Sequence, residues 1–556
     1  MKRLHEALTG IAAVAVVVAA VLYHSGDKRP FAMSAVRQAE KLTGLKFDGG
    51  ERALMMESLA ENLTSYENIR QLSLPIHIPP AIQFNPFPID HLVVLEKKSV
   101  RWSPVEISSV PQNLEKLAFH SVAELAELIR TRRITSTQLT RMYLSRLKKH
   151  APALECVVTL TEELALAQAE RADEEIAAGI YRGPLHGIPY GAKDLLAVKG
   201  YRTTWGAAPY KDQVIDEDAT VIRKLEKAGA VLMAKLTMGA LAWGDVWFGG
   251  KTRNPWNLEE GSRGSSAGSG SATAAGLVAF AIGTETWGSI VAPSTRCGIT
   301  GLRPTFGRVS RAGAMPLSWS MDKIGPMCRT VEDCAIVFNA IYGPDGMDQS
   351  VTALPFSYSP EVDLSQLRIG FLEPDFRRES DTQANDLAVL EVLESLGAEP
   401  VPISLPDFPV AHLSFILSAE AAAVFDDLTR SEEDDLLVRQ GENAWPNVFR
   451  TSRFIPAVEY IQANRARHLL QQEMAVLMKT VDVYVAPSFG GDNLLLTNLT
   501  GHPCVVVPSG FKENGSPSSI SFMGQLYNEG TVLAVAKAYQ DATDWHKQHP
   551  PTFVSD

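Results

Sequence analysis

The residues from Gly261 to Gly276 read GSRGSSAGSGSATAAG, a run in which serine hydroxyls alternate with glycines. Such hydroxyls can serve as nucleophiles, and glycine-rich loops can also cradle phosphates. A P-loop is disfavoured because its lysine is absent and because no clear strand precedes a G-x-G-x-x-G pattern here. A flexible linker is disfavoured because Ala272–Ala275 favours helix and an apolar stretch follows directly.

A nucleophile elbow is a third interpretation of the same run. Gly264–Gly268 fits the G-x-S-x-G pattern of α/β-hydrolases. That elbow follows a buried strand, whereas the residues before Gly264 are polar and include Pro255. It also needs a downstream acid and histidine, for which several histidines offer no distinguishing context. This interpretation is disfavoured but stays open.

A longer ordered pattern surrounds the run and supports a fourth interpretation. Upstream lie GPLHGIP (183–189), Lys193-Asp194 and NPW (254–256), and downstream lie GTETWGSI (283–290), CG (297–298), GLRPT (301–305), NLTG (498–501) and ATDW (542–545). This order resembles the amidase signature family, which includes bacterial amidases, fatty acid amide hydrolase and the A-type chain of the tRNA amidotransferases. The similarity runs from about Leu117 to Pro550.

The resemblance implies a catalytic set, position by position. It places the nucleophile on Ser289, the bridging serine on Ser265 and the base on Lys193, with Ser266 supporting the network. It also implies a cis peptide bond between Gly264 and Ser265. Backbone N–H groups of the nucleophile loop would form the oxyanion hole, namely those of Thr286, Trp287, Gly288 and Ser289.

This set meets the chemical demands of amide hydrolysis. The reaction needs an activated nucleophile, a stabilised oxyanion and a proton donor for the leaving nitrogen. Lys193 can act as a base only when it is neutral, which requires burial or electropositive surroundings that lower its pKa. The apolar residues near it in sequence, Ile188, Pro189, Leu195 and Leu196, are compatible with burial.

Two positions depart from the family. Trp287 stands where the family usually has glycine, and Val291 stands where many relatives carry arginine. The bulky residue leaves the backbone donors in place but reshapes the acyl pocket beside them. By position, the resemblance places Met238, Trp243 and Trp247 in the substrate pocket, which predicts an apolar acyl side.

The elements that must position these residues indicate an α/β fold. Apolar strand-like segments such as 231–234, 277–282 and 483–486 alternate with helices. The resemblance implies the amidase signature fold, a large mixed central sheet with helices on both faces. We expect three parts: residues 1–29, a helical and Pro-rich arm over 30–115, and a catalytic domain over 116–556. Helices are predicted after Ser121, over 136–149 and from 161 to before 179, with a capping-box pattern at Ser121 and Glu124.

The N-terminus predicts export. Lys2 and Arg3 precede an apolar run from Leu8 to Tyr23, which is the layout of a signal peptide or a signal anchor. We therefore expect an extracytoplasmic enzyme, either periplasmic or secreted, or held at the membrane by this segment.

Composition narrows the partners. A net charge of −12 and a pI near 5.6 disfavour binding to nucleic acid. The five cysteines lack a zinc-binding spacing and are interpreted as buried small hydrophobes. We expect no cofactor and no metal, and a small-molecule amide as substrate.

The sequence thus predicts a serine amidohydrolase of linear amides that forms an acyl-enzyme on Ser289. The glutamine-hydrolysing subunit of a tRNA amidotransferase is an alternative, which the acidic composition and the N-terminal segment disfavour. An esterase or carbamate hydrolase with the same three residues also stays open. A catalytically dead binding module is disfavoured because all three positions hold competent residues.

Overall fold

The computed structural model describes residues 30–72, 75, 78–88, 96–107 and 109–554. The chain divides into two compact units, Met1–Pro75 and Ile76–Asp556. The three-part division expected from sequence stays a prediction.

The described part of the first unit is a pair of helices, α2 (Met33–Thr43) and α3 (Gly49–Arg70). The first helix ends at Gly44, whose left-handed φ of 71° glycine adopts readily. Asp48 begins the second helix with a capping box. An ion pair of 2.6 Å between Glu40 and Arg52 joins the two helices.

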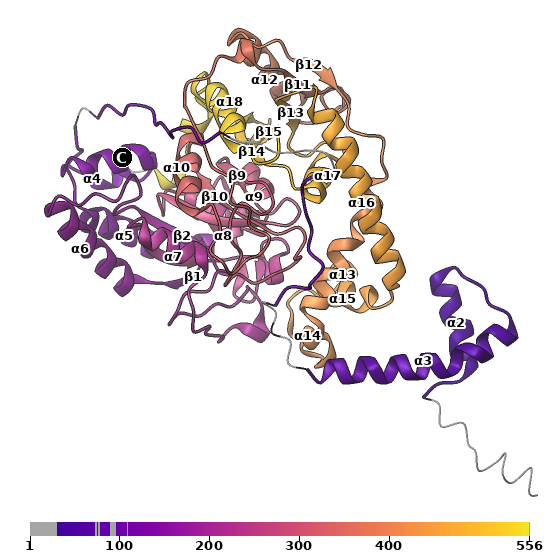
Figure 1. The fold of residues 1–556 in the computed structure, drawn as a ribbon. Coiled ribbons are helices and arrows are strands. Elements are labelled where there is room, and N and C mark those ends of the chain that lie inside the picture. Colours follow the sequence, from indigo (N-terminus) through magenta and orange to yellow (C-terminus); the bar gives the residue numbers. More distant parts are fainter. Residues whose placement is uncertain (1–29, 73–74, 76–77, 89–95, 108, 555–556) are drawn as a thin grey trace, which may run out of the picture. The chain divides into compact units, whose positions relative to one another are not determined.

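A mixed sheet forms the centre of the second unit (Figure 1). In its described residues eleven strands pair in the order β1-β3-β2-β8-β10-β9-β14-β15-β13-β11-β12. β2 runs parallel to β3 and β8, β11 runs parallel to β12 and β13, and the other pairs are antiparallel. The strands are β1 (Val157–Leu160), β2 (Pro189–Lys193), β3 (Val231–Leu236), β8 (Phe280–Glu285), β9 (Thr300–Arg303), β10 (Lys323–Cys328), β11 (Ile369–Leu372), β12 (Val401–Ile403), β13 (Val483–Pro487), β14 (Cys504–Phe511) and β15 (Pro517–Gly524).

Helices cover both faces of this sheet. α8 and α9 pack against β8, β14 and β15, while α10, α12 and α18 pack against β10, β14 and β15. The helices are α4 (Val122–Arg130), α5 (Ser136–Leu154), α6 (Glu162–Ala177), α7 (Thr220–Lys227), α8 (Ala267–Ala274), α9 (Val291–Cys297), α10 (Val331–Ile341), α11 (Glu373–Phe376), α12 (Gln383–Ser395), α13 (Phe415–Val424), α14 (Asp426–Arg430), α15 (Trp445–Ser452), α16 (Ala457–Met478), α17 (Asn493–Thr500) and α18 (Glu529–Asp541). Two short ribbons lie outside the sheet, β4 (Val246–Trp247) with β5 (Gly250–Lys251) and β6 (Arg253–Asn254) with β7 (Asn257–Gly261).

The local predictions in this unit are confirmed with small shifts in their bounds. Both hydrogen bonds of the capping box between Ser121 and Glu124 are present at the start of α4. The strand predicted over 277–282 begins later, at Phe280, because residues 274–279 first leave α8 and turn. The glycine-serine run forms α8, and all residues of that helix are buried. Its small side chains let it pack closely beneath the strands that carry the site.

The Pro-rich arm has no regular secondary structure over residues 78–88. Its aromatic residues still pack on the catalytic unit. Phe84 lies edge-on to Phe306, with ring centroids 5.1 Å apart, and Phe87 stacks on Tyr527 at 4.8 Å. The arm is thus laid on the main body of this unit, as its composition predicts.

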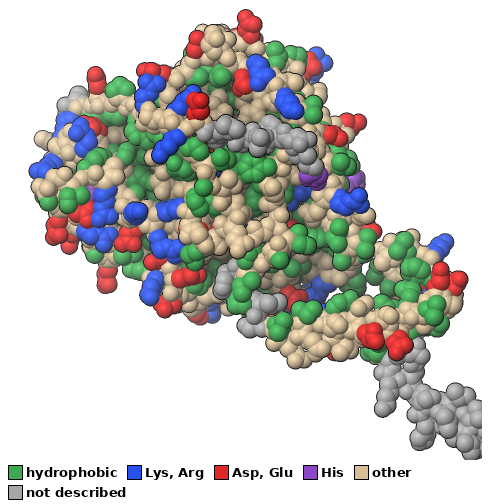
Figure 2. Space-filling view, viewed as in Figure 1, with side chains coloured by type: hydrophobic (Ala, Val, Ile, Leu, Met, Phe, Trp, Pro, Cys, Tyr) green, Lys and Arg blue, Asp and Glu red, His purple; other side chains and the backbone are tan. Residues whose placement is uncertain are grey.

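The five cysteines are free and buried, as predicted. The predicted export segment lies outside the described residues. Among the described residues, no helix is long and apolar enough to cross a membrane. On the visible face in Figure 2, acidic and basic side chains are interspersed over the large unit.

Candidate active site

Three segments bring the predicted residues together at one edge of the sheet. Lys193 is the last residue of β2, and Ser289 lies in the loop after β8. Because β2 and β8 are parallel neighbours, their carboxyl ends lie at the same edge. Ser265 and Ser266 stand directly before α8, and the Gly264–Ser265 peptide bond is cis, as the resemblance implied.

Lys193 is fully buried among hydroxyl groups. Its Nζ lies 2.8 Å from Oγ of Ser265, 3.0 Å from Oγ of Ser266 and 2.8 Å from Oγ1 of Thr284. Burial lowers the pKa of Lys193 to about 7, although the negative charges of Asp322 and Glu285 oppose that shift. An amine in this setting can exchange a proton near neutral pH.

Thr284 is a site residue that the sequence analysis missed. It lies on β8, and both its hydroxyl and its carbonyl oxygen accept hydrogen bonds from Lys193. The only sequence signal was its place inside GTETWGSI, where the pattern itself draws attention to Ser289. Its contact with Lys193 depends on the pairing of β2 with β8, which sequence spacing does not reveal.

The loop from Thr286 to Ser289 presents unused backbone donors. Within the described residues, none of its four backbone N–H groups donates a hydrogen bond. Gly288 has a φ of 83°, and a Cβ there would come within 3.1 Å of Leu494. Trp287 has no such left-handed backbone, so a bulky residue fits there. Free N–H groups beside a serine hydroxyl are the arrangement of an oxyanion hole.

Ser289 lines a pocket of about 470 Å³. Its carbonyl accepts a hydrogen bond of 3.2 Å from the backbone N–H of Ser266. In the described residues its hydroxyl makes no hydrogen bond, to Ser265 or to any other group. Contacts between catalytic groups commonly tighten only when substrate binds.

The pocket over Ser289 has aromatic walls. Trp243, Trp287 and Trp445 line it, and the rings of Trp243 and Trp445 meet edge to face at 4.9 Å. Met238 and Trp247, which we also expected here, do not line it. Both are buried, and the ring of Trp247 packs against Phe248. Position in the chain therefore identified one of three pocket residues and missed Trp445, which comes from α15.

A buried carboxylate holds the nucleophile loop. One oxygen of Glu285 accepts hydrogen bonds from the backbone N–H groups of Ile290 and Val291, at 2.8 and 3.0 Å. The other oxygen accepts from Arg303 at 2.8 Å and from Asn498 at 2.9 Å. Burial would raise the pKa of Glu285, but Arg303 and the other donors outweigh it and hold the pKa at about 2.

A second buried carboxylate, Asp322, fixes the other side of the loop. It accepts a hydrogen bond of 2.5 Å from the hydroxyl of Thr286. Its second oxygen accepts from the backbone N–H groups of Leu317 and Ser318, at 2.7 and 3.0 Å. Burial raises the pKa of Asp322 despite these donors. The loop is thus tied to two carboxylates, neither of which forms an ion pair with Lys193 in the described residues.

Comparison with known proteins decides the family. The family model described as Amidase matches residues 138–494, more than half of this chain. The chain belongs to the Amidase family. The predicted resemblance is therefore confirmed, and this Amidase family member is an enzyme that acts on C–N bonds.

Relatives and solved structures match over nearly their whole length. The A-type chain of the glutamyl-tRNA(Gln) amidotransferase of Methylococcus capsulatus is 36% identical over 479 residues, covering 77% of this chain and 98% of the relative. The chain of the same name from Geobacillus kaustophilus is 34% identical over 481 residues, covering 78% and 99%. The native peptide amidase of Stenotrophomonas maltophilia is similar in structure, with a TM-score of 0.68, 30% identity and coverage of 77% and 97%. The predicted fold class is confirmed by such structures.

The predicted extracytoplasmic location is wrong. The two amidotransferase relatives belong to an enzyme that is named for glutamyl-tRNA, rather than to the exported hydrolases. The apolar N-terminal run pointed to export because its length and basic head match a signal, yet that pattern carries no information about the catalytic partner. A membrane tether has no support in the described residues.

The Glu285–Arg303 pair leads to a stability prediction. Both side chains are fully buried, so Glu285→Gln leaves the Arg303 charge without its counterion. Breaking a buried pair in this way costs about 3–5 kcal/mol. We expect a clear fall in the thermal unfolding midpoint by scanning calorimetry at pH 7.

The matched control is Glu260→Gln, which breaks the half-exposed pair with Arg296 and costs at most about 1 kcal/mol. Because the Glu285 pKa is depressed from 4.5 to about 2, its stabilisation is fully present above pH 4.5 and is lost as the pH falls toward 2. The difference between wild type and Glu285→Gln should shrink over that range. Equal effects of the two substitutions at pH 7 would contradict the positioning role of Glu285.

Proposed function

We propose that this chain is a serine amidohydrolase that cleaves an amide C–N bond through an acyl-enzyme on Ser289. The observation that carries the proposal is the buried Lys193 amine, 2.8 Å from Ser265 and with a pKa lowered to about 7. A lysine of this kind is half deprotonated near neutral pH and can take a proton from a hydroxyl. The free N–H groups of the 286–289 loop support the same reaction.

The proposed steps balance within these residues. Ser265 passes a proton to neutral Lys193 as it takes one from Ser289, whose Oγ then bonds to the carbonyl carbon of the amide. The loop N–H groups stabilise the oxyanion. The proton returns through Ser265 to the leaving nitrogen, the C–N bond breaks and an ester remains on Ser289. Water attacks that ester by the same relay and releases the carboxylic acid.

The pocket supports an apolar acyl group as the preferred substrate. Besides its three tryptophans it is lined by Leu317, Leu417 and Val448. Burying an aromatic or aliphatic acyl group against such walls is favourable by about 25 cal/mol per Å² of apolar surface. A free amino acid would lose the hydration of two charges on entering the same space.

Glutamine hydrolysis within a tRNA amidotransferase is the second candidate function. The amidotransferase relatives cover most of this chain. The pocket also carries one acidic and one basic residue, Asp245 and Arg263, and such a pair could face the two charges of glutamine. On this candidate the acyl group is charged, so the two functions differ in a measurable way.

A substrate panel separates the two candidates. We expect kcat/KM for phenylacetamide to exceed that for L-glutamine by about 100-fold or more, because charges that are left poorly paired in a pocket cost several kcal/mol. Ammonia release measures both reactions in one assay, and phenyl acetate and phenyl carbamate test the ester and carbamate alternatives. A higher kcat/KM for glutamine would favour the amidotransferase function.

The catalytic roles predict a shared loss. Ser289→Ala, Ser265→Ala and Lys193→Ala should each reduce kcat by about 10³-fold or more, because the residues act as one relay. Ser271→Ala is the matched control, since this buried serine of α8 donates to the carbonyl of Arg253 outside the site. An acylated peptide containing Ser289 should be trapped by mass spectrometry in wild type. Full activity of the Ser289 variant would refute the proposal.

The pH dependence follows from the Lys193 pKa. The pKa is lowered from 10.5 to about 7 by burial, so the neutral form predominates above pH 7. We expect kcat/KM to rise with pH, reach half its maximum near pH 7 and then level off. Activity that keeps rising to pH 10 would show that Lys193 does not titrate as the base.

A further inference from the structure

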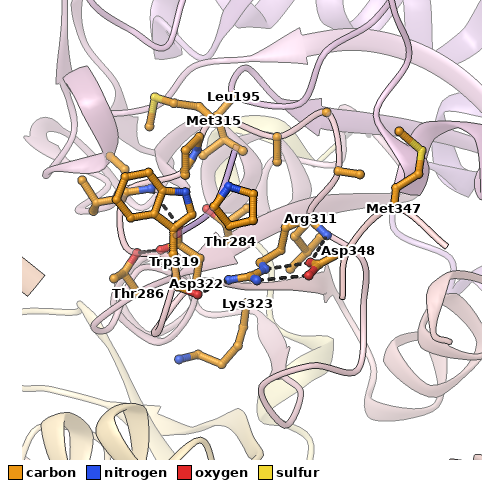
Figure 3. A pocket seen from close by; sticks show the side chains of 18 of the residues that line it. Leu195, Thr284, Thr286, Arg311, Met315, Trp319, Asp322, Lys323, Met347 and Asp348 are labelled. Carbon is orange, nitrogen blue, oxygen red and sulfur yellow. Dashed lines mark hydrogen bonds and ion pairs between the residues drawn. The ribbon is translucent and has the colours of Figure 1, made fainter. Parts of the chain in front are cut away.

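A second cavity of about 490 Å³ lies next to the pocket over Ser289 (Figure 3). The two share three lining residues, Ala242, Thr286 and Leu317, so they adjoin at the nucleophile loop. The second cavity also reaches Thr284, whose hydroxyl contacts Lys193. One pocket therefore opens on Ser289, and the other opens on the lysine side of the relay.

The acidic residues of the second cavity lie at two depths. Asp322 lies beside it in the interior, and Asp216 and Glu217 line it nearer to solvent. Asp216 also forms an ion pair of 3.2 Å with Lys199, in which both side chains are largely exposed. An exposed pair of this kind is weak and screened by solvent, so it leaves the outer part of the cavity acidic.

The two basic residues that line the cavity are engaged elsewhere. The guanidinium of Arg311 is paired with Asp348 at 2.8 Å. Lys323 donates to the carbonyl of Met321, and Figure 3 shows its side chain extending away from Trp319. The charge that the cavity presents to a ligand is therefore mainly negative.

The rest of the wall is apolar. In Figure 3, Leu195, Met315 and Trp319 lie together along one side of the cavity. The loop that separates the two pockets is held rigidly, because Glu420 accepts hydrogen bonds from the hydroxyls of Ser318 and Ser320. Together with the bonds of Asp322 to the same loop, this makes the cavity a permanent feature of the fold.

We propose that the second cavity binds the amine half of an N-substituted amide whose acyl half lies in the pocket over Ser289. The inference rests on the proposed function and specifies its substrate class, a secondary amide with an apolar amine such as an arylalkylamine. The size of the cavity and its apolar walls suit a ring, and its position places the amine nitrogen toward the lysine side of the relay.

The chemistry of the two products supports this assignment. Cleavage breaks the C–N bond, the carbonyl carbon stays on Ser289 and the nitrogen receives a proton by way of Ser265. The free amine then takes a further proton from water and becomes an ammonium ion near neutral pH. Asp216 and Glu217 attract that cation, whereas they would repel the carboxylate formed from the acyl half.

The test compares two amides of one acid, phenylacetamide and N-benzylphenylacetamide. Ala314, half-buried and lining the second cavity, is changed to Phe to fill it. We expect kcat/KM for the N-benzyl amide to fall by about tenfold or more, and that for phenylacetamide to change by less than about twofold. Ala314→Ser is the matched control, since it adds one oxygen and leaves the space open.

Met347→Trp provides a second variant in case Ala314→Phe folds poorly. Met347 lines the same cavity and is exposed, so a larger residue there narrows the space without entering the core. Benzylamine should inhibit wild type and inhibit either filled variant less, while phenylacetate should inhibit all of them equally.

The outcomes distinguish the two levels of the argument. Equal losses for both amides, unchanged hydrolysis of the N-benzyl amide by both filled variants, or wild type that cleaves only the primary amide would overturn the cavity assignment and leave the acyl-enzyme mechanism intact. Absence of any acyl-enzyme on Ser289 with either amide would refute the proposed function, and the cavity assignment with it.

Discussion

The burial of one amine away from any paired carboxylate is the constraint on which the site depends. Lys193 is fully enclosed, and within the described part of the chain its Nζ donates only to oxygens of Ser265, Ser266 and Thr284. A charged ammonium in such a place is costly, so burial drives its pKa down to about 7. A carboxylate paired with Lys193 would stabilise the charged form and abolish the base. The fold instead directs both nearby carboxylates, Glu285 and Asp322, toward other donors.

Those two carboxylates explain how the nucleophile loop keeps its backbone donors free. Glu285 binds the N–H groups that follow Ser289, and Asp322 binds the hydroxyl of Thr286 that precedes it. The loop is therefore held at both ends, while the N–H groups between them stay available. Val291, which replaces an arginine common in the family, contributes its backbone N–H to this network. The positive charge that balances Glu285 comes from Arg303 on β9.

The same loop divides the space available to a substrate. Thr286 lines both cavities, and Leu317 on the neighbouring segment forms a wall between them. One side is aromatic and leads to Ser289, and the other is apolar with acidic residues toward solvent. An amide that spans the loop would present its carbonyl carbon to the nucleophile and its nitrogen to the proton relay. Specificity for both halves then follows from one rigid partition rather than from moving parts.

The sequence by itself determined the fold class, the family and the identities of Lys193, Ser265 and Ser289, because the spacing of glycine and serine around α8 and β8 records close packing that few folds require. Capping residues such as Ser121 determined helix starts, since those hydrogen bonds are local. The tertiary structure alone decided that Thr284 contacts Lys193, that Trp445 rather than Met238 or Trp247 lines the pocket, and that a second cavity adjoins it. These facts depend on which strands pair and which distant helices meet, and such contacts leave no regular spacing along the chain.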